Sequence, residues 1–285
     1  NLHVGLTISF ADTIVSILLP SLFIMLLCEN SIKYFYISLI LFLLYLTKNS
    51  FMFVVIIVPF LILLLEKDRL KYKLIPFCGV ILAILIWGFF GLVNTGKFPI
   101  GTSNLTSNPK TLYEVVLNKD FKKYYPYKSV DLIPKKKLPT HLKNEWEIFD
   151  YYKKKNKEYL KANSIEYLSD LIIKIKFIFF NLKKDSAFPE NGIYKNPIIF
   201  SHVINKTAFI IFIIIFSISI VKKLKLKSNN SFKVLKNEIY LFFIMGFYFI
   251  PLIVGWATSK HLVAVHLIAF IYLIHISNKK LIKKN

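Results

Sequence analysis

The sequence predicts an all-α polytopic membrane protein with about seven transmembrane helices and one large extracytoplasmic loop domain. Hydrophobic residues make up 55% of the 285 residues, the mean hydropathy is +0.53, and only 19% of residues are charged. This balance does not fit a soluble surface. The net charge of +22 lies mainly between the apolar blocks. We therefore expect no nucleic-acid partner and no disordered basic tail.

Seven apolar segments come close to the length of about 20 residues that a helix needs to cross a bilayer. They are 6–28, 34–47, 50–65, 74–93, 197–221, 239–257 and 262–276. The second and third are short and are separated only by Lys48 and Asn49, so they are expected to form a tight hairpin. The fifth contains Lys206 in its first half.

Lysines in the short loops predict the orientation. Lys and Arg are retained on the cytoplasmic side of a membrane, whereas long translocated loops are largely exempt from this rule. The basic segments 67–73, 222–236 and 279–284 fall on one side of a seven-span arrangement. We therefore expect a multi-pass protein of the inner (plasma) membrane, with membrane lipids around it and loop 95–196 outside.

Three regions follow from this topology. They are 1–94 with four transmembrane helices, the extracytoplasmic loop domain 95–196, and 197–285 with three transmembrane helices and a basic cytoplasmic tail. Within the loop, 145–162 lacks Gly and Pro and is predicted to be helical. Segment 165–182 is predicted to be an interfacial helix along the outer leaflet, because Asp170 and Lys174 break a membrane-spanning pattern. A helix packed within the loop domain is the alternative.

Four stretches carry, in order, a resemblance to a known family. They are "LLYLTKNSFMFVV", "VNTGKFPIGTSNLTSNP", "EWEIFDYYKKKNKEYLKANSIEYLSDLIIKIKFIFF" and "GWATSKHLVAVHLIAFIYLI". Together they resemble the C-terminal half of glycosyltransferase family 39, the bacterial relatives of dolichyl-phosphate-mannose protein mannosyltransferases with the GT-C fold. The likeness covers nearly the whole chain and rests on the order of the stretches. Lys48 and Lys260 stand where the family commonly has Arg.

The resemblance implies a membrane glycosyltransferase that moves a sugar from a polyprenyl-phosphate lipid to an acceptor at the outer membrane face. The family's catalytic acidic pair lies in a first external loop to which nothing here corresponds, so it is expected upstream of Asn1. The chain begins without Met, and we expect it to be a piece of a longer protein. Family members differ in their use of a divalent cation, so the resemblance leaves the cofactor open. It also leaves open which sugar is transferred and to which acceptor.

Lys48, Lys260 and His261 are the predicted ligands of the donor phosphate. Lysine is a point-charge phosphate ligand, and all three residues reach the external boundary in the predicted topology. The alternative is that both lysines are turn residues whose side chains extend to water, and that His261 caps the last helix.

Asp12 and Asn104 are predicted to line the same site. Asp12 is an acid within an apolar segment, where an unpaired carboxylate is costly, and the family often carries an acid in the matching helix. An N-cap of a helix that begins at Thr13 is the alternative for Asp12. Asn104 lies in the Gly-, Ser- and Asn-rich external segment of the resemblance.

Cysteines and histidines predict no further chemistry. Cys28 and Cys78 both fall in apolar runs and are expected to be core hydrophobes. The histidines of the spans are too scattered for a metal site, so none is proposed.

Three other kinds of function stay open. The first is an O-antigen polymerase or a flippase; polymerases are expected to carry paired Arg-rich loops, but Arg69 is the single arginine. Secondary transporters are expected to have matching broken helices and no loop of this size. The third possibility is a non-catalytic truncated or accessory subunit, because the chain offers no assignable nucleophile or base.

Overall fold

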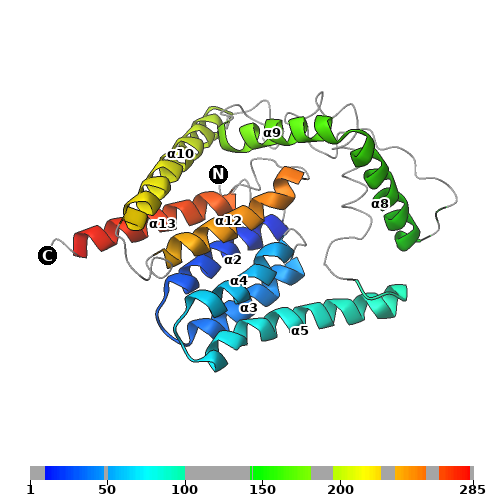
Figure 1. Ribbon diagram of the computed structural model, residues 1–285, viewed down its shortest axis with the longest axis horizontal. Helices are drawn as coiled ribbons and strands as arrows, with labels where there is room; N and C mark the ends of the chain where they lie inside the picture. Colours follow the sequence, from blue (N-terminus) through cyan, green and yellow to red (C-terminus); the bar gives the residue numbers. More distant parts are fainter. Residues whose placement is uncertain are drawn as a thin grey trace. The chain divides into compact units, whose positions relative to one another are not determined.

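The structure is a computed structural model that describes residues 10–47, 51–99, 142, 144–180, 195–225, 235–254 and 263–282. These residues form nine α-helices, labelled as in Figure 1, and contain no strand. The helices are α2 (Phe10–Leu27), α3 (Lys33–Thr47), α4 (Met52–Leu65), α5 (Leu70–Thr95), α8 (Glu145–Ala162), α9 (Ser164–Phe180), α10 (Lys195–Lys225), α12 (Lys236–Val254) and α13 (Val263–Ile282). The all-α prediction is confirmed for this part of the chain.

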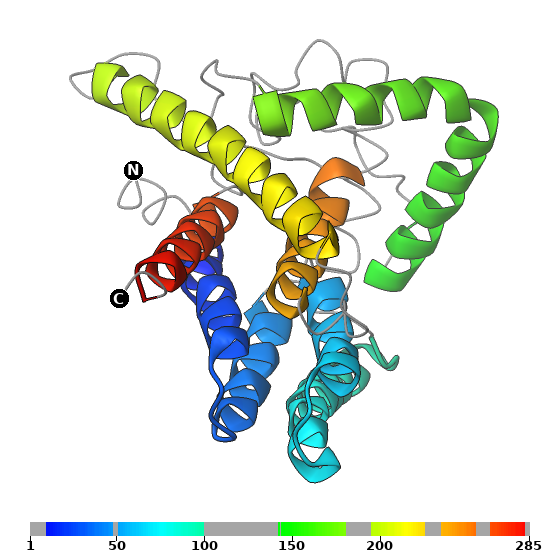
Figure 2. The same ribbon diagram turned by 60° about the vertical axis from the view of Figure 1, so that its left-hand side comes forward.

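The chain divides into two compact units. Unit 1 comprises Asn1–Thr102, Thr207–Phe249 and Leu262–Asn285, and unit 2 comprises Ser103–Lys206 and Ile250–His261. Unit 1 therefore holds α2 to α5, most of α12 and α13, and the second half of α10 (Figure 2). The predicted division at residues 94 and 196 stays a prediction.

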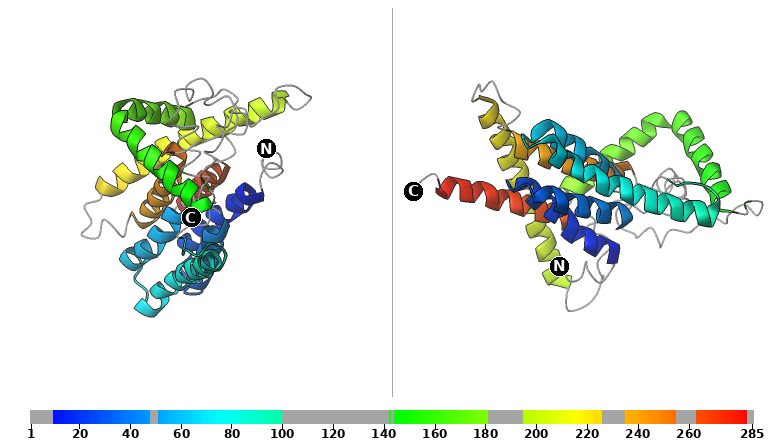
Figure 3. Two further views of the ribbon diagram at one scale, coloured as in Figure 1. Left: turned by 90° about the vertical axis from the view of Figure 1, so that its right-hand side faces the viewer. Right: turned by 90° about the horizontal axis from the view of Figure 1, so that it is seen from below.

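Helix α3 is the centre of the first four helices. It packs most extensively against α5 and also against α2, and Figure 3 shows α3 and α5 side by side. A small residue permits this close approach, because a Cβ added to Gly79 would overlap the backbone carbonyl oxygen of Ser38. The buried core of these helices includes Leu19, Phe23, Ile37, Leu41, Leu44, Val54, Val58 and Ala83.

Local sequence explains where two helices end or begin. Gly96 follows α5 with φ 72°, a left-handed conformation that favours glycine, and its N–H donates to the carbonyl of Leu92 at 2.9 Å. Asn144 caps α8 by accepting from the N–H of Glu147 at 2.9 Å, and its amide donates to the Glu147 carboxylate at 2.8 Å.

Unit 2 contains the helix pair α8 and α9. The predicted helix 145–162 is confirmed residue for residue, and α9 begins one residue before the predicted segment 165–182. The apolar side chains of Leu168, Ile172 and Ile175 recur at helical spacing on α9 and are exposed. Such a face suits an interfacial helix, although the location of α9 at a membrane surface stays a prediction.

Two helical segments are long and apolar enough to cross a membrane. They are Leu70–Thr95 and Val203–Lys225, and only 33% and 17% of their most apolar windows are buried. Large side chains such as Phe89 and Phe90 are more than half exposed on α5. Contiguous exposed apolar surface of this kind marks contact with a partner or a membrane.

The other predicted spans are shorter as helices. At 15 and 14 residues, α3 and α4 each extend only about 21 to 22 Å, less than the hydrocarbon thickness of about 30 Å. Each of the seven predicted spans coincides with a helix, but only the two long segments meet the length and composition criteria among the described residues.

Candidate functional site

Most of the predicted site residues lie outside the part of the chain that the structure describes. These are Lys48, Asn104, Lys260 and His261. Asp12 is the third residue of α2, but its side chain is not among those described. Because α2 begins at Phe10, Asp12 lies inside the helix, and its interpretation as the N-cap of a helix that begins at Thr13 is wrong.

The structure instead brings charged side chains together at one end of unit 1. This end is formed by the α2–α3 and α4–α5 turns, the last turns of α10, the start of α12 and the later part of α13. All of these segments belong to the end that the sequence predicts to face the cytoplasm. We call this end of unit 1, formed by these segments, the basic end.

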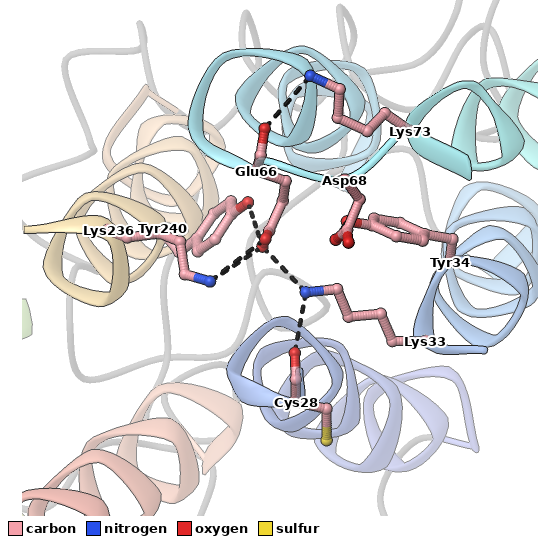
Figure 4. A network of polar contacts seen from close by, with 8 residues as sticks. All are labelled: Cys28, Lys33, Tyr34, Glu66, Asp68, Lys73, Lys236 and Tyr240. Carbon is pink, nitrogen blue, oxygen red and sulfur yellow. Dashed lines mark hydrogen bonds and ion pairs between the residues drawn. The ribbon is translucent and has the colours of Figure 1, made fainter. Parts of the chain in front are cut away.

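Glu66 is the first of two buried acids at the basic end (Figure 4). It follows the last residue of α4 in an extended conformation, and its side chain is only 5% exposed. The carboxylate accepts from the ammonium groups of Lys33 at 3.1 Å and Lys236 at 3.3 Å. The Tyr240 hydroxyl donates to the same carboxylate at 3.1 Å. Glu66, directly after α4, therefore contacts Lys33 of α3 and both Lys236 and Tyr240 of α12, so it connects these three helices.

Lysines at the basic end also bond to carbonyl groups at the ends of helices. Lys33, whose side chain is 2% exposed, donates to the carbonyl of Cys28 just after α2 at 2.9 Å. Lys73 of α5 donates to the carbonyls of Leu63 at 2.9 Å and Glu66 at 3.3 Å. The last carbonyls of a helix have no partner within that helix, so these lysines compensate for the loss of water there.

Glu238 is the second buried acid, in the first turn of α12. Lys223 of α10 donates to both of its carboxylate oxygens at 2.6 Å. The hydroxyls of Ser219 and Tyr272 donate to it at 3.1 and 2.9 Å. A carboxylate at the N-terminus of a helix is also favoured by the helix dipole. Glu238 thus joins α10, α12 and α13.

Two further polar pairs complete this end. The Tyr34 hydroxyl donates to the Asp68 carboxylate at 2.5 Å, which links the start of α3 to the α4–α5 turn. The side chains of Asn237 and His275 lie 3.2 Å apart and link α12 to α13.

A cavity of about 510 Å³ lies among these groups. Its lining includes the charged side chains of Glu29, Lys33, Glu66, Lys67, Asp68, Lys223 and Lys236. The Lys223 and Lys236 side chains are 30% and 26% exposed although each is ion-paired. Glu66 and Glu238 connect the ends of neighbouring helices through their ion pairs, and the partly exposed ammonium groups of Lys223 and Lys236 line the cavity.

Unit 2 has a separate polar contact. The Tyr167 hydroxyl of α9 donates to the carbonyl of Val254 at 3.2 Å. Burial raises the pKa of the Tyr167 phenol, because the charged form loses its hydration. The phenol therefore stays protonated and able to donate this hydrogen bond above the pH at which an exposed tyrosine ionises.

The burial of the two cysteines differs in part from the prediction. Cys78 is exposed, so its prediction as a core residue is wrong, and Cys28 is only partly buried. The neighbours Gly79 and Val80 occupy the buried side of α5 near Cys78. Both cysteines are free thiols. Within the described residues, no group of three or more His, Cys, Asp or Glu side chains is suitably placed for a metal ion.

The basic end contains residues that the sequence did not single out. Lys223 and Lys236 contribute to the prediction only as orientation signals, and neither Glu66 nor Glu238 is among the predicted site residues. The available signal is local: each acid lies within three residues of the end of an apolar run and close to lysines. Comparison of the chain with protein-family models, with curated proteins and with solved structures finds no match.

Proposed function

We propose that the chain is an integral membrane protein in which seven apolar segments cross the bilayer with the basic end in the cytoplasm. Two features support this topology. The basic end gathers helix ends that the positive-inside rule assigns to a single side. In addition, α5 carries large apolar side chains on an exposed face, as expected for contact with lipid.

Cysteine labelling tests this topology. The chain has two cysteines, Cys28 and Cys78, which are replaced by alanine before single cysteines are introduced by Ser103→Cys and Ser228→Cys. A membrane-impermeant maleimide is expected to label S103C in intact cells and S228C only after permeabilisation. Labelling of S228C in intact cells would contradict the orientation.

We further propose that the protein is the C-terminal portion of a glycosyltransferase that uses a polyprenyl-phosphate sugar at the outer membrane face. The observation that carries this proposal is the resemblance of the four stretches. In the structure these stretches include parts of α3 and α4, the helix pair α8–α9 and part of α13, and the pair α8–α9 belongs to a separate unit. The chemical step requires a general base, which this proposal assigns to the upstream part of the protein.

In this proposal Lys48, Lys260 and His261 hold the donor phosphate. All three residues lie outside the part of the chain that the structure describes, and the assignment rests on the resemblance and on the predicted topology, which brings each of them to the outer boundary.

Lys260→Ala in the full-length protein is expected to reduce sugar transfer in isolated membranes about 10- to 100-fold. A hydrogen bond to a charged group contributes about 1.5 to 3 kcal/mol, and about 1.4 kcal/mol corresponds to a factor of ten in rate. Transfer is measured with a radiolabelled polyprenyl-phosphate sugar at low and at saturating donor. Lys222→Ala, which removes an exposed lysine from the basic end, is the control. Unchanged transfer by the Lys260→Ala protein at both donor concentrations would overturn the assignment.

A further inference from the structure

The cavity at the basic end has no role in sugar transfer as proposed above. It lies among helix ends that the proposed topology places in the cytoplasm, whereas the donor phosphate is handled at the outer face. Its lining nevertheless combines several lysine ammonium groups with a space of about 510 Å³, which is large enough for a small ligand.

Lys223 and Lys236 have hydrogen-bonding capacity beyond their ion pairs. Lys236 donates to the two oxygens of Glu66, and Lys223 donates to the two oxygens of Glu238. An ammonium group carries three N–H donors. Both side chains are partly exposed and line the cavity, so a donor of each can reach a ligand there without breaking the existing pair.

Lysines slightly outnumber carboxylates in the lining of the cavity. Lys33 and Lys236 both contact the Glu66 carboxylate, and Glu29 and Asp68 are the other acids of the lining. Lys67 adds another exposed ammonium at the cavity. The start of α12 also lines the space with Lys236 and Asn237, and the first N–H groups of a helix favour an anion.

Exposed basic residues surround the cavity. The α4–α5 connection carries Arg69, the first turn of α5 carries Lys71, and the last turn of α10 carries Lys222 and Lys225. A bound cation would be repelled by this field, whereas an anion would be attracted and would partly neutralise it.

We propose that this cavity binds a phosphate-bearing anion, with Lys236 and Lys223 as its charged donors and Lys67 at its edge. The phosphate belongs either to the headgroup of an anionic phospholipid in the adjacent leaflet or to a soluble phosphate. The proposal does not depend on the proposed glycosyltransferase activity, and its test measures binding alone.

The test uses the purified full-length protein in two arms. In the first arm, the protein is reconstituted into nanodiscs of mixed phosphatidylcholine and phosphatidylglycerol, and retained lipid is identified by native mass spectrometry. In the second arm, binding of radiolabelled inorganic phosphate is measured in detergent. Retention of phosphatidylglycerol alone identifies the lipid as the source, and saturable binding of inorganic phosphate identifies a soluble ligand. Binding in neither arm overturns the proposal.

Lys236→Met is the decisive variant. It leaves Glu66 paired with Lys33 and Tyr240, so the buried acid keeps a counter-charge. The expected result is binding about tenfold weaker in the arm that detects a ligand, because one charged hydrogen bond is lost. Lys225→Met removes the same charge from an exposed residue at the end of α10 that contributes to the surrounding field but does not line the cavity, so it is expected to weaken binding less than about twofold.

Equal weakening by Lys236→Met and Lys225→Met would show that only the general charge of this end matters, and it would overturn the site. If Lys236→Met lowers the yield of folded protein, Lys67→Gln provides a second test at an exposed lining residue. That variant is expected to weaken binding severalfold, and unchanged binding would overturn the proposal.

Discussion

Glu66→Gln is expected to destabilise the protein by about 3 to 5 kcal/mol, the cost of removing one member of a buried ion pair. Glutamine preserves the shape of the side chain but removes the charge that compensates two ammonium groups. Lys33 is most affected, since its side chain is 2% exposed and Glu66 is the carboxylate that it contacts. The measurement is thermal unfolding in detergent, followed by circular dichroism.

Glu29→Gln is the matched control for this change. Glu29 lines the same cavity but is exposed, so the same substitution is expected to change stability by less than about 0.5 kcal/mol. Adding Lys236→Met to Glu66→Gln should recover part of the loss, because one uncompensated cation is removed. Equal stability of Glu66→Gln and Glu29→Gln would mean that the Glu66 network contributes little to the fold.

Gly79→Ala and Gly246→Ala are expected to change stability in opposite directions. A Cβ at Gly79 would overlap the carbonyl oxygen of Ser38 and lie 2.8 Å from its carbonyl carbon, so α3 and α5 would have to separate. Overpacking of this kind costs about 1 to 3 kcal/mol. A Cβ at Gly246 in α12 meets nothing within 4 Å, and alanine there gains about 1 kcal/mol of helix propensity.

Unfolding midpoints of the two alanine variants in the same detergent measure this difference. Ser38→Ala is not expected to rescue Gly79→Ala, because the nearest atom is a backbone oxygen rather than the Ser38 hydroxyl. Gly79→Leu extends the test, since a larger side chain should prevent the contact between α3 and α5 altogether. A Gly79→Ala midpoint at or above that of the parent protein would contradict the close packing.

The helices could be predicted from the sequence because their signals are local. The helix 145–162 has no Gly or Pro, and the end of α3 at Thr47 is followed by a polar break between two apolar runs. Residues a few positions apart decide such features. The same local pattern indicates which end of a span is basic, and the network at the basic end agrees with that indication.

The partners within the network could not be predicted. Glu66 and Lys236 are 170 residues apart in the chain, and no periodicity relates their positions. Hydropathy also cannot tell which side of an apolar helix faces its neighbours, which is why Cys78 was expected in the core although it is exposed. The predicted phosphate ligands Lys48, Lys260 and His261 lie outside the described residues and stay predictions.

The first turn of α12 has a mechanical consequence for the rest of that helix. Lys236 and Glu238 are two positions apart, which corresponds to about 200° around a helix axis. They bond to two different partners, Glu66 and Lys223. A rotation of α12 about its axis would strain both ion pairs at once. About three turns further along the same helix, Tyr248 stacks on Phe51. The ion pairs at the basic end therefore favour the same rotation of α12 that this stacking requires.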